Sequence, residues 1–200
     1  MIDMIMDCKS LAEKACKHWF AYQNPVELEL ALRVAKEFCP KVVVEIGIAY
    51  CASLACWAEI ARPDLVIGID PMTLPATEEQ KGVIDFLTAL YKIHIIKQPS
   101  CLPKAHSELE ALLGDKKIDF LFIDADHRYD SVRADWDNYL PYMNSPSMVG
   151  FHDIYYSDKI FDSGSQVSFL WDRIKRQMKY NRFDEFHYHS SMGIGIVYLP

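Results

Sequence analysis

The stretch VVVEIG at residues 42–47 decides the fold of this chain. Its three consecutive valines, with a glycine closing the run, are typical of a strand that is buried on both faces of a parallel sheet. Before it, Asn24 and Pro25 read as the cap and first residue of a helix whose apolar residues recur at helical spacing as far as Phe38. After it, residues 52–61 have a helical pattern. A helix, a buried strand and a second helix in this order predict an α/β sheet.

The same alternation of strands and helices continues along the chain. Further strands are predicted at 65–69, 93–96, 120–123 and 148–151, and further helices at 78–90, 104–113, 132–143 and 169–178. A short connection separates the last two strands, 183–188 and 194–199, so we expect them to pair as a hairpin. The prediction is an α/β, Rossmann-like, doubly wound and mostly parallel seven-stranded sheet with a C-terminal antiparallel hairpin.

The length of the chain, 200 residues with half of them apolar, is enough for one domain with a full hydrophobic core. We find no linker, internal repeat or low-complexity segment. The expectation is a single domain over residues 1–200, in which residues 1–22 form an N-terminal helical extension.

Composition and charge exclude several classes of function. The formal net charge of -7 argues against nucleic acid as a partner, because phosphate binding needs a basic surface. No run of 18 apolar residues is present, so we expect no membrane partner, and the acidic N-terminus does not resemble a signal peptide, so we expect a cytoplasmic protein. The six cysteines form no CxxC pair, which argues against a zinc site or a disulfide framework.

Polar and acidic residues follow each predicted strand, where ligands bind in an open α/β sheet. Five ionisable residues crowd into the two loops after the fourth and fifth strands, namely Asp124, Asp126, His127, His152 and Asp153. Gathering so many ionisable groups is unfavourable unless a metal or a charged ligand compensates them. We therefore place the functional site at this edge of the sheet.

The loop after the first strand bears on the kind of ligand. It contains Gly47 but no GxGxxG pattern, so a pyrophosphate could not lie against it. Asp70 follows the second strand and is placed to accept hydrogen bonds from a ribose diol. A ligand with a ribose and no pyrophosphate fits both observations.

Five segments of the chain resemble those of class I S-adenosylmethionine-dependent methyltransferases. They are EIGIAYCAS, VIGIDP, IDFLFIDADHRYDSV, VGFHDI and SSMGIGIVYLP. The resemblance is strongest to the small-molecule O-methyltransferase branch, which includes catechol-type enzymes and sugar or antibiotic O-methyltransferases. It covers residues 23–200, and the most specific part is IDADHRYDSV followed about twenty residues later by FHDI.

The resemblance implies that S-adenosylmethionine is the cofactor and that it binds at Glu45, Gly47, Ser53, Asp70, Ser100 and Asp124. Glu45 and Gly47 would shape the pocket for its methionine end, and Ser53 would bind the carboxylate near a helix start, where free backbone N–H groups favour an anion. Asp70 would hold the ribose hydroxyls, and Ser100 would lie near adenine.

The resemblance also implies a divalent metal, held by Asp124, His152 and Asp153, with Asp124 and His127 as the catalytic residues and His127 as the general base. A structural alternative for His127 is that it caps the helix that follows. Two residues depart from the family pattern. His152 replaces a usual carboxylate, which would shift the preference from Mg²⁺ toward Mn²⁺, Fe²⁺ or Zn²⁺. Cys51 replaces a usual glycine, which would keep the backbone farther from the cofactor.

The expected function is therefore S-adenosylmethionine-dependent, divalent-metal-assisted O-methylation of a hydroxyl on a small-molecule acceptor that carries adjacent hydroxyls. Whether the chain forms a homo-oligomer is left open. Two alternatives remain. A metal-dependent hydrolase would use the Asp and His cluster and bind two metals, and a degenerate cofactor-binding protein would bind the cofactor weakly without turnover.

Overall fold

A computed structural model describes residues 6–155, 165–177, 182–189 and 192–200. It contains a seven-stranded sheet in the order β3-β2-β1-β4-β5-β7-β6. The strands are β1 Val42–Ile46, β2 Leu65–Ile69, β3 His94–Ile96, β4 Ile118–Ile123, β5 Met143–His152, β6 Phe183–Phe186 and β7 Ile194–Leu199. The helices are α1 Cys8–His18, α2 Pro25–Phe38, α3 Ala52–Ala61, α4 Glu78–Tyr91, α5 Pro103–Leu113, α6 Tyr129–Tyr139 and α8 Val167–Gln177, with a short 3₁₀ helix, η1 Leu140–Tyr142.

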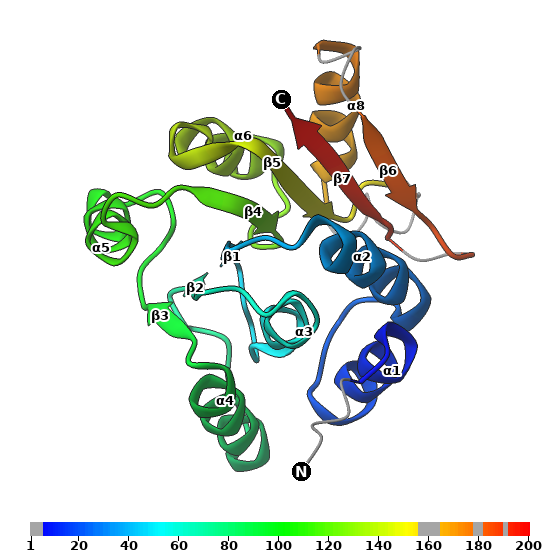
Figure 1. Ribbon diagram of the computed structural model, residues 1–200, viewed down its shortest axis with the longest axis vertical. Helices are drawn as coiled ribbons and strands as arrows, with labels where there is room; N and C mark the ends of the chain where they lie inside the picture. Colours follow the sequence, from blue (N-terminus) through cyan, green and yellow to red (C-terminus); the bar gives the residue numbers. More distant parts are fainter. Residues whose placement is uncertain (1–5, 156–164, 178–181, 190–191) are drawn as a thin grey trace.

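The strand directions confirm the predicted fold class. β3, β2, β1, β4 and β5 are parallel neighbours. β7 runs antiparallel to β5 and pairs on its other side with β6, so the C-terminal hairpin forms the end of the sheet. In Figure 1, α1 to α4 lie on one side of the sheet and α5, α6 and α8 on the other, as a doubly wound sheet requires.

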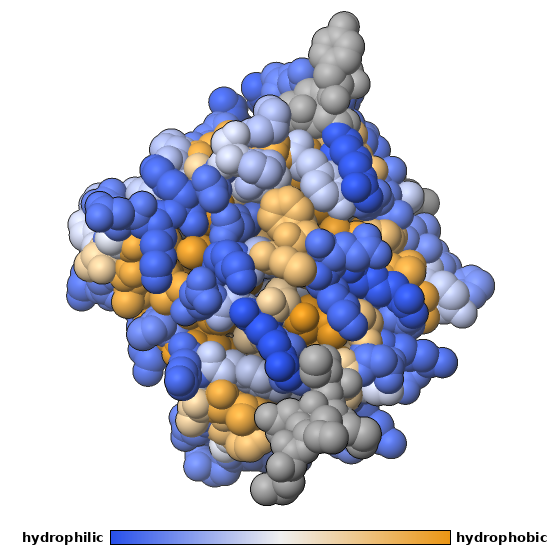
Figure 2. All heavy atoms as spheres, viewed as in Figure 1, coloured by the Kyte–Doolittle hydropathy of each residue, from blue (hydrophilic) through white to orange (hydrophobic). Residues whose placement is uncertain are grey.

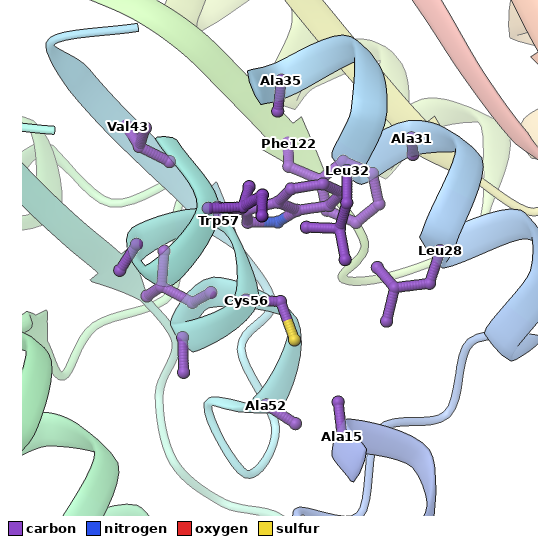
Figure 3. Close-up of a cluster of buried hydrophobic side chains, with 14 of the residues drawn as sticks. Ala15, Leu28, Ala31, Leu32, Ala35, Val43, Ala52, Cys56, Trp57 and Phe122 are labelled. Atoms are coloured by element: carbon purple, nitrogen blue, oxygen red, sulfur yellow. The ribbon is translucent and has the colours of Figure 1, made fainter. Parts of the chain in front are cut away.

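The apolar run that begins with Val42 builds a core on both faces of the sheet. Successive side chains of a strand point to opposite faces, so Val43 packs toward α2 and α3, whereas Val42 and Val44 pack toward the opposite helices. Figure 3 shows Trp57 of α3 in the first of these clusters, close to Leu32 of α2. All five residues of β1 are buried, as the sequence pattern predicted.

Several boundaries differ from those predicted. The helix expected over 132–143 starts at Tyr129 and gives way after Tyr139 to η1, because Pro141 has no N–H to continue an α-helix. Residues 143–147 belong instead to β5, which begins earlier than expected. The predicted last helical residue, Met178, lies outside the described residues.

Hydrophilic side chains cover most of the face seen in Figure 2, with smaller apolar patches between them. Within the described residues, no helix combines the length and the apolar character needed to cross a membrane. All six cysteines are free thiols.

At Gly47 the loop after β1 closely approaches the loop after β4. Gly47 follows β1 with a φ of +83°, a left-handed conformation that L side chains rarely adopt. A Cβ placed on Gly47 would lie 2.2 Å from the carbonyl oxygen of Asp124 and 2.5 Å from Cα of Ala125. Only glycine therefore allows the loop after β1 to lie against the loop after β4.

We predict that Gly47→Ala lowers the free energy of unfolding by at least about 2 kcal/mol, from left-handed backbone strain together with overpacking. Thermal and denaturant unfolding measure this loss. Gly82→Ala is the matched control. Gly82 lies inside α4, and a Cβ there would have no heavy atom within 4 Å, so that variant should gain roughly 0.5–1 kcal/mol. Equal stability of Gly47→Ala and the unmutated protein would contradict the close approach.

Candidate active site

Two cavities lie at the carboxyl ends of the parallel strands. The larger, of about 580 Å³, is lined by the loops after β1 to β4 and by the first turns of α6. The smaller, of about 320 Å³, is lined by residues 20–23, the start of α3, the ends of β4 and β5, and Met192. Both cavities include Gly47, Ala49, Asp124 and Ala125 in their walls, so they meet where β1 and β4 end.

Glu45 lies in β1 and points toward α3. Its side chain is fully buried and accepts hydrogen bonds from Ser53 Oγ at 2.5 Å and from Trp57 Nε1 at 2.9 Å. Burial raises the pKa of Glu45 to about 8, against the lowering effect of the hydrogen bond from Ser53. Ser53 lines the smaller cavity, whereas Glu45 lines neither, so Glu45 supports the site from behind Ser53.

Asp70 holds the loop that follows β1. Its Oδ2 accepts hydrogen bonds from the backbone N–H groups of Ile48 and Ala49, at 2.9 and 3.2 Å, and its Oδ1 accepts one from Met72 at 2.6 Å. The same carboxylate lines the larger cavity. Asp70 thus fixes the shape of the loop in addition to facing the cavity.

Cys51 precedes α3 in the same loop. It adopts a left-handed conformation, with a φ of +67°, which is the conformation that glycine favours. Its side chain is fully buried, packs in the core and lines neither cavity. Cysteine therefore keeps the backbone shape of a glycine here, and its side chain does not take up cavity space.

Ser100 lines the larger cavity. Its Oγ donates a hydrogen bond of 2.6 Å to Oδ1 of Asp135, and its carbonyl oxygen accepts one of 3.0 Å from Tyr139. Asp135 is 3% exposed and lines the same cavity. Burial raises the pKa of Asp135 to about 6, although the hydrogen bond from Ser100 lowers it.

Four of the five clustered ionisable residues come together at the smaller cavity. His127 Nδ1 lies 2.7 Å from Asp153 Oδ2, and His127 Nε2 lies 3.4 Å from Asp124 Oδ1. His152 Nδ1 lies between the same two carboxylates, 3.2 Å from Asp124 Oδ1 and 3.1 Å from Asp153 Oδ1. Two imidazoles therefore bridge two buried carboxylates.

The bridging carboxylates keep both histidines protonated. Burial lowers the pKa of His127, but its hydrogen bonds to Asp124 and Asp153 outweigh that effect and raise the pKa to about 10. Burial also lowers the pKa of His152, whereas the negative charge of Asp124 raises it to about 9. Burial works to raise the pKa of Asp124, but the charge of His152 and hydrogen bonds from both histidines hold it well below its ordinary value.

Asp126, the fifth residue, lies outside this cluster. It accepts hydrogen bonds from Arg128 and from Ser131 Oγ, the latter at 2.9 Å, and it lines the larger cavity. A hydrolase that needs all five residues together is not supported by this arrangement. The helix-capping alternative for His127 also lacks support, because other side chains bond the start of α6: the N–H of the N-cap Arg128 donates to Asp126 Oδ1, and the N–H of Tyr129 donates to Gln166 Oε1.

The side chains of the cluster fit a metal ion in their chemistry but not in their present arrangement. Its chemistry suits a divalent cation, since Asp124, His152 and Asp153 offer carboxylate and imidazole ligands. His152 Nε2 is buried and has no hydrogen-bond partner among the described residues. In the described ranges, however, no group of three such side chains is already arranged to hold a metal, because the imidazoles lie between the carboxylates. Binding would require His152 to shift.

Two residues that the sequence analysis did not single out contribute to the site. Gln23, in the segment before α2, donates a hydrogen bond of 2.5 Å to Asp124 Oδ2 and lines the smaller cavity. No local pattern identifies it, since the two residues are 101 positions apart. Asp135 does have a signal. It shares the buried face of α6 with Val132, Trp136 and Tyr139, and a carboxylate on an apolar helix face needs a partner.

We predict that Glu45→Gln reduces the dependence of stability on pH. Glu45 has an ordinary pKa of 4.5 and a folded-state pKa of about 8, so the folded protein binds a proton that the unfolded chain releases in this interval. Its contribution to stability is complete below about pH 4.5 and is lost as the pH rises to about 8. Glutamine cannot ionise, and it can still satisfy both neighbours, because its Oε1 can accept from Trp57 Nε1 and its NH₂ group can donate to Ser53 Oγ.

The unfolding midpoint of Glu45→Gln, relative to that of the unmutated protein, should therefore rise between those two pH values. Glu79→Gln, at an exposed position in the first turn of α4, is the control and should show no such trend. Parallel pH profiles for Glu45→Gln and the unmutated protein would contradict a neutral Glu45.

Comparisons of the sequence with known proteins bear on the site directly. The model of a family described as methyltransferase domains matches residues 44–154, which include the ends of all five parallel strands. An uncharacterized protein of Acanthamoeba polyphaga mimivirus is 32% identical over 112 residues, 55% of this chain and 50% of that protein. An uncharacterized protein of Sinorhizobium fredii is 27% identical over 119 residues, 57% of this chain and 13% of that protein. The match thus spans half or less of the length of these curated relatives.

Solved structures share the fold. A Staphylococcus aureus protein assigned as a caffeoyl-CoA O-methyltransferase superposes with a TM-score of 0.67, at 16% identity, over 98% of this chain and 93% of that one. The O-methyltransferase TomG of Streptomyces achromogenes, in complex with S-adenosylmethionine, superposes with a TM-score of 0.61 at 13% identity, over 97% of this chain and 89% of that one. The methyltransferase MycE, in complex with Mg and S-adenosylhomocysteine, superposes with a TM-score of 0.62 at 17% identity, over 96% of this chain and 54% of that one.

The family model covers more than half of the chain and contains the strand ends that form both cavities. The sheet order, the C-terminal hairpin and the joined cavities agree with that assignment. The chain therefore belongs to the family of methyltransferase domains.

Proposed function

We propose that this protein transfers the methyl group of S-adenosylmethionine to a hydroxyl of a small molecule. The observation that carries the proposal is that the two cavities meet at Gly47 and Asp124. The larger contains groups suited to a nucleoside, and the smaller contains the cluster of two histidines and two carboxylates. A methyl donor in the first cavity would then meet an acceptor in the second.

The proposed cofactor site uses the larger cavity for adenosine and the junction for the methionine end. Asp70 and Ser100 are the polar groups for the ribose and the base. Ser53 lies in the first turn of α3, whose N-cap Cys51 makes no side-chain hydrogen bond to the free N–H groups. Free N–H groups at a helix start attract an anion, which supports this turn as the site for the carboxylate of the cofactor.

His127 is the proposed general base. Its side chain is 35% exposed, whereas that of His152 is 7% exposed, so His127 is the histidine that an acceptor can reach. Once His127 has lost its own proton, it takes the proton of the acceptor hydroxyl. The hydroxyl oxygen then forms a bond to the methyl carbon, the bond from that carbon to sulfur breaks, and S-adenosylhomocysteine is released. Asp124 and Asp153 orient the ring.

A divalent cation held by Asp124, His152 and Asp153 is the second part of the proposal. When bound, it would lower the pKa of a coordinated hydroxyl and neutralise the carboxylates that hold the proton on His127. The donor chemistry supports it, and so does His152 Nε2, which is buried and has no hydrogen-bond partner among the described residues.

We predict that His127→Ala lowers methyl transfer by about 10²–10⁴-fold while leaving the affinity for S-adenosylhomocysteine unchanged, because a general base acts on the acceptor. The assay is transfer of labelled methyl from S-adenosylmethionine to a panel of catechols, sugars and other polyols. His94→Ala, at an exposed position on the edge strand β3, is the control and should keep full activity. Normal turnover of His127→Ala would contradict a role for this histidine as general base. Absence of transfer by the unmutated protein to every hydroxyl acceptor would count against the proposed function.

For the cation, titration calorimetry with Mn²⁺ should give one site per chain, weakened roughly tenfold or more in Asp153→Asn. Asp126→Asn is the matched control, since Asp126 pairs with Arg128 outside the cluster. His152→Asp should raise the affinity for Mg²⁺ relative to Mn²⁺, because Mg²⁺ prefers oxygen ligands. No measurable Mn²⁺ binding, or equal weakening in Asp126→Asn, would reject the metal site.

A further inference from the structure

Asp135 is a buried carboxylate in the wall of the larger cavity. It lies in α6 between apolar neighbours and is 3% exposed. A carboxylate in such a place is unfavourable unless its oxygens find hydrogen-bond donors. The cavity beside it is the one in which we place the adenosine part of the cofactor.

One oxygen of Asp135 has a partner and the other does not. Oδ1 accepts the hydrogen bond of 2.6 Å from Ser100, whose own backbone is held by Tyr139. Among the residues that the structure describes, Oδ2 has no hydrogen-bond partner. This oxygen is not fully shielded from solvent, and Asp135 lines the larger cavity. A group bound in the cavity can therefore reach Oδ2. The Ser100 contact therefore fixes the carboxylate while Oδ2 stays available.

The charge of Asp135 decides what Oδ2 can bind. Although burial raises the pKa of this carboxyl to about 6, it is mostly ionised at neutral pH. An ionised carboxylate accepts hydrogen bonds and donates none. The partner of Oδ2 must then be a donor, and an oxygen at the same place would be repelled.

We propose that Asp135 is a specificity-determining residue that recognises the 6-amino group of the adenine base and rejects a 6-oxo purine. The proposal rests on the proposed placement of the cofactor in the larger cavity. Ser100 acts as the positioning residue, because it holds Oδ1 and thereby directs Oδ2. Adenine offers two N–H donors at this position, whereas hypoxanthine offers a carbonyl oxygen.

The experiment compares two ligands, S-adenosylhomocysteine and its 6-oxo analogue, S-inosylhomocysteine, by titration calorimetry. The unmutated protein should bind the adenine compound about 10- to 100-fold more tightly, the range for a hydrogen bond to a charged group. In Asp135→Asn this ratio should fall toward one, because an amide can present either its oxygen or its NH₂ group. Ser100→Ala should lower the ratio as well, by releasing Oδ1.

Asp126→Asn is the matched control, since it makes the same substitution in the wall of the same cavity at a residue already paired with Arg128. It should keep the ratio of the unmutated protein. The proposal is overturned if the unmutated protein binds both ligands equally, or if Asp135→Asn weakens both by the same factor. If Asp135→Asn does not fold, an unchanged ratio in Ser100→Ala overturns it. Failure of the unmutated protein to bind either ligand would instead reject the cofactor site itself.

Discussion

The architecture of the site depends on the contact between the loop after β1 and the loop after β4. Gly47 lies so close to the backbone of Asp124 and Ala125 that no side chain fits between them. The N–H of Gly47 donates to the carbonyl of Ile69 in β2, and the N–H of Asp124 donates to that of Ile46 in β1, each at 2.9 Å. Three adjacent strands therefore fix one junction, and both cavities open from it.

Around that junction the protein accommodates buried and partly buried carboxylates in three different ways. Glu45 keeps its proton, because burial and the negative charges of Asp124 and Asp70 raise its pKa. Asp70 accepts hydrogen bonds from three backbone N–H groups. Asp124 and Asp153 are instead compensated by the two imidazoles between them. Each arrangement lowers the same unfavourable term, the loss of water around a charge. Only the third places a proton where a ligand can reach it.

Much of the fold and part of the site could be predicted from the sequence. Consecutive valines and glycine or proline at the ends of elements reflect local sterics and burial, so strands, helices and the residues after each strand were found. Contacts that depend on which of several possible partners a side chain binds could not be predicted in this way. Asp126 was grouped with its neighbours, yet Arg128 lies two residues away and pairs with it instead. The contact of Gln23 with Asp124 joins distant segments, and nothing in either segment indicates it.

The hydrogen bonds of Asp70 have a further consequence for recognition. Because Asp70 already holds the backbone N–H groups of Ile48 and Ala49, the turn after β1 has its shape before any ligand binds. A molecule entering there loses little binding free energy to conformational entropy, which is the advantage of a preorganised site. Selectivity at this turn then arises from the rigidity of the backbone. A ligand whose shape does not match the loop binds weakly, because the loop does not adapt to it.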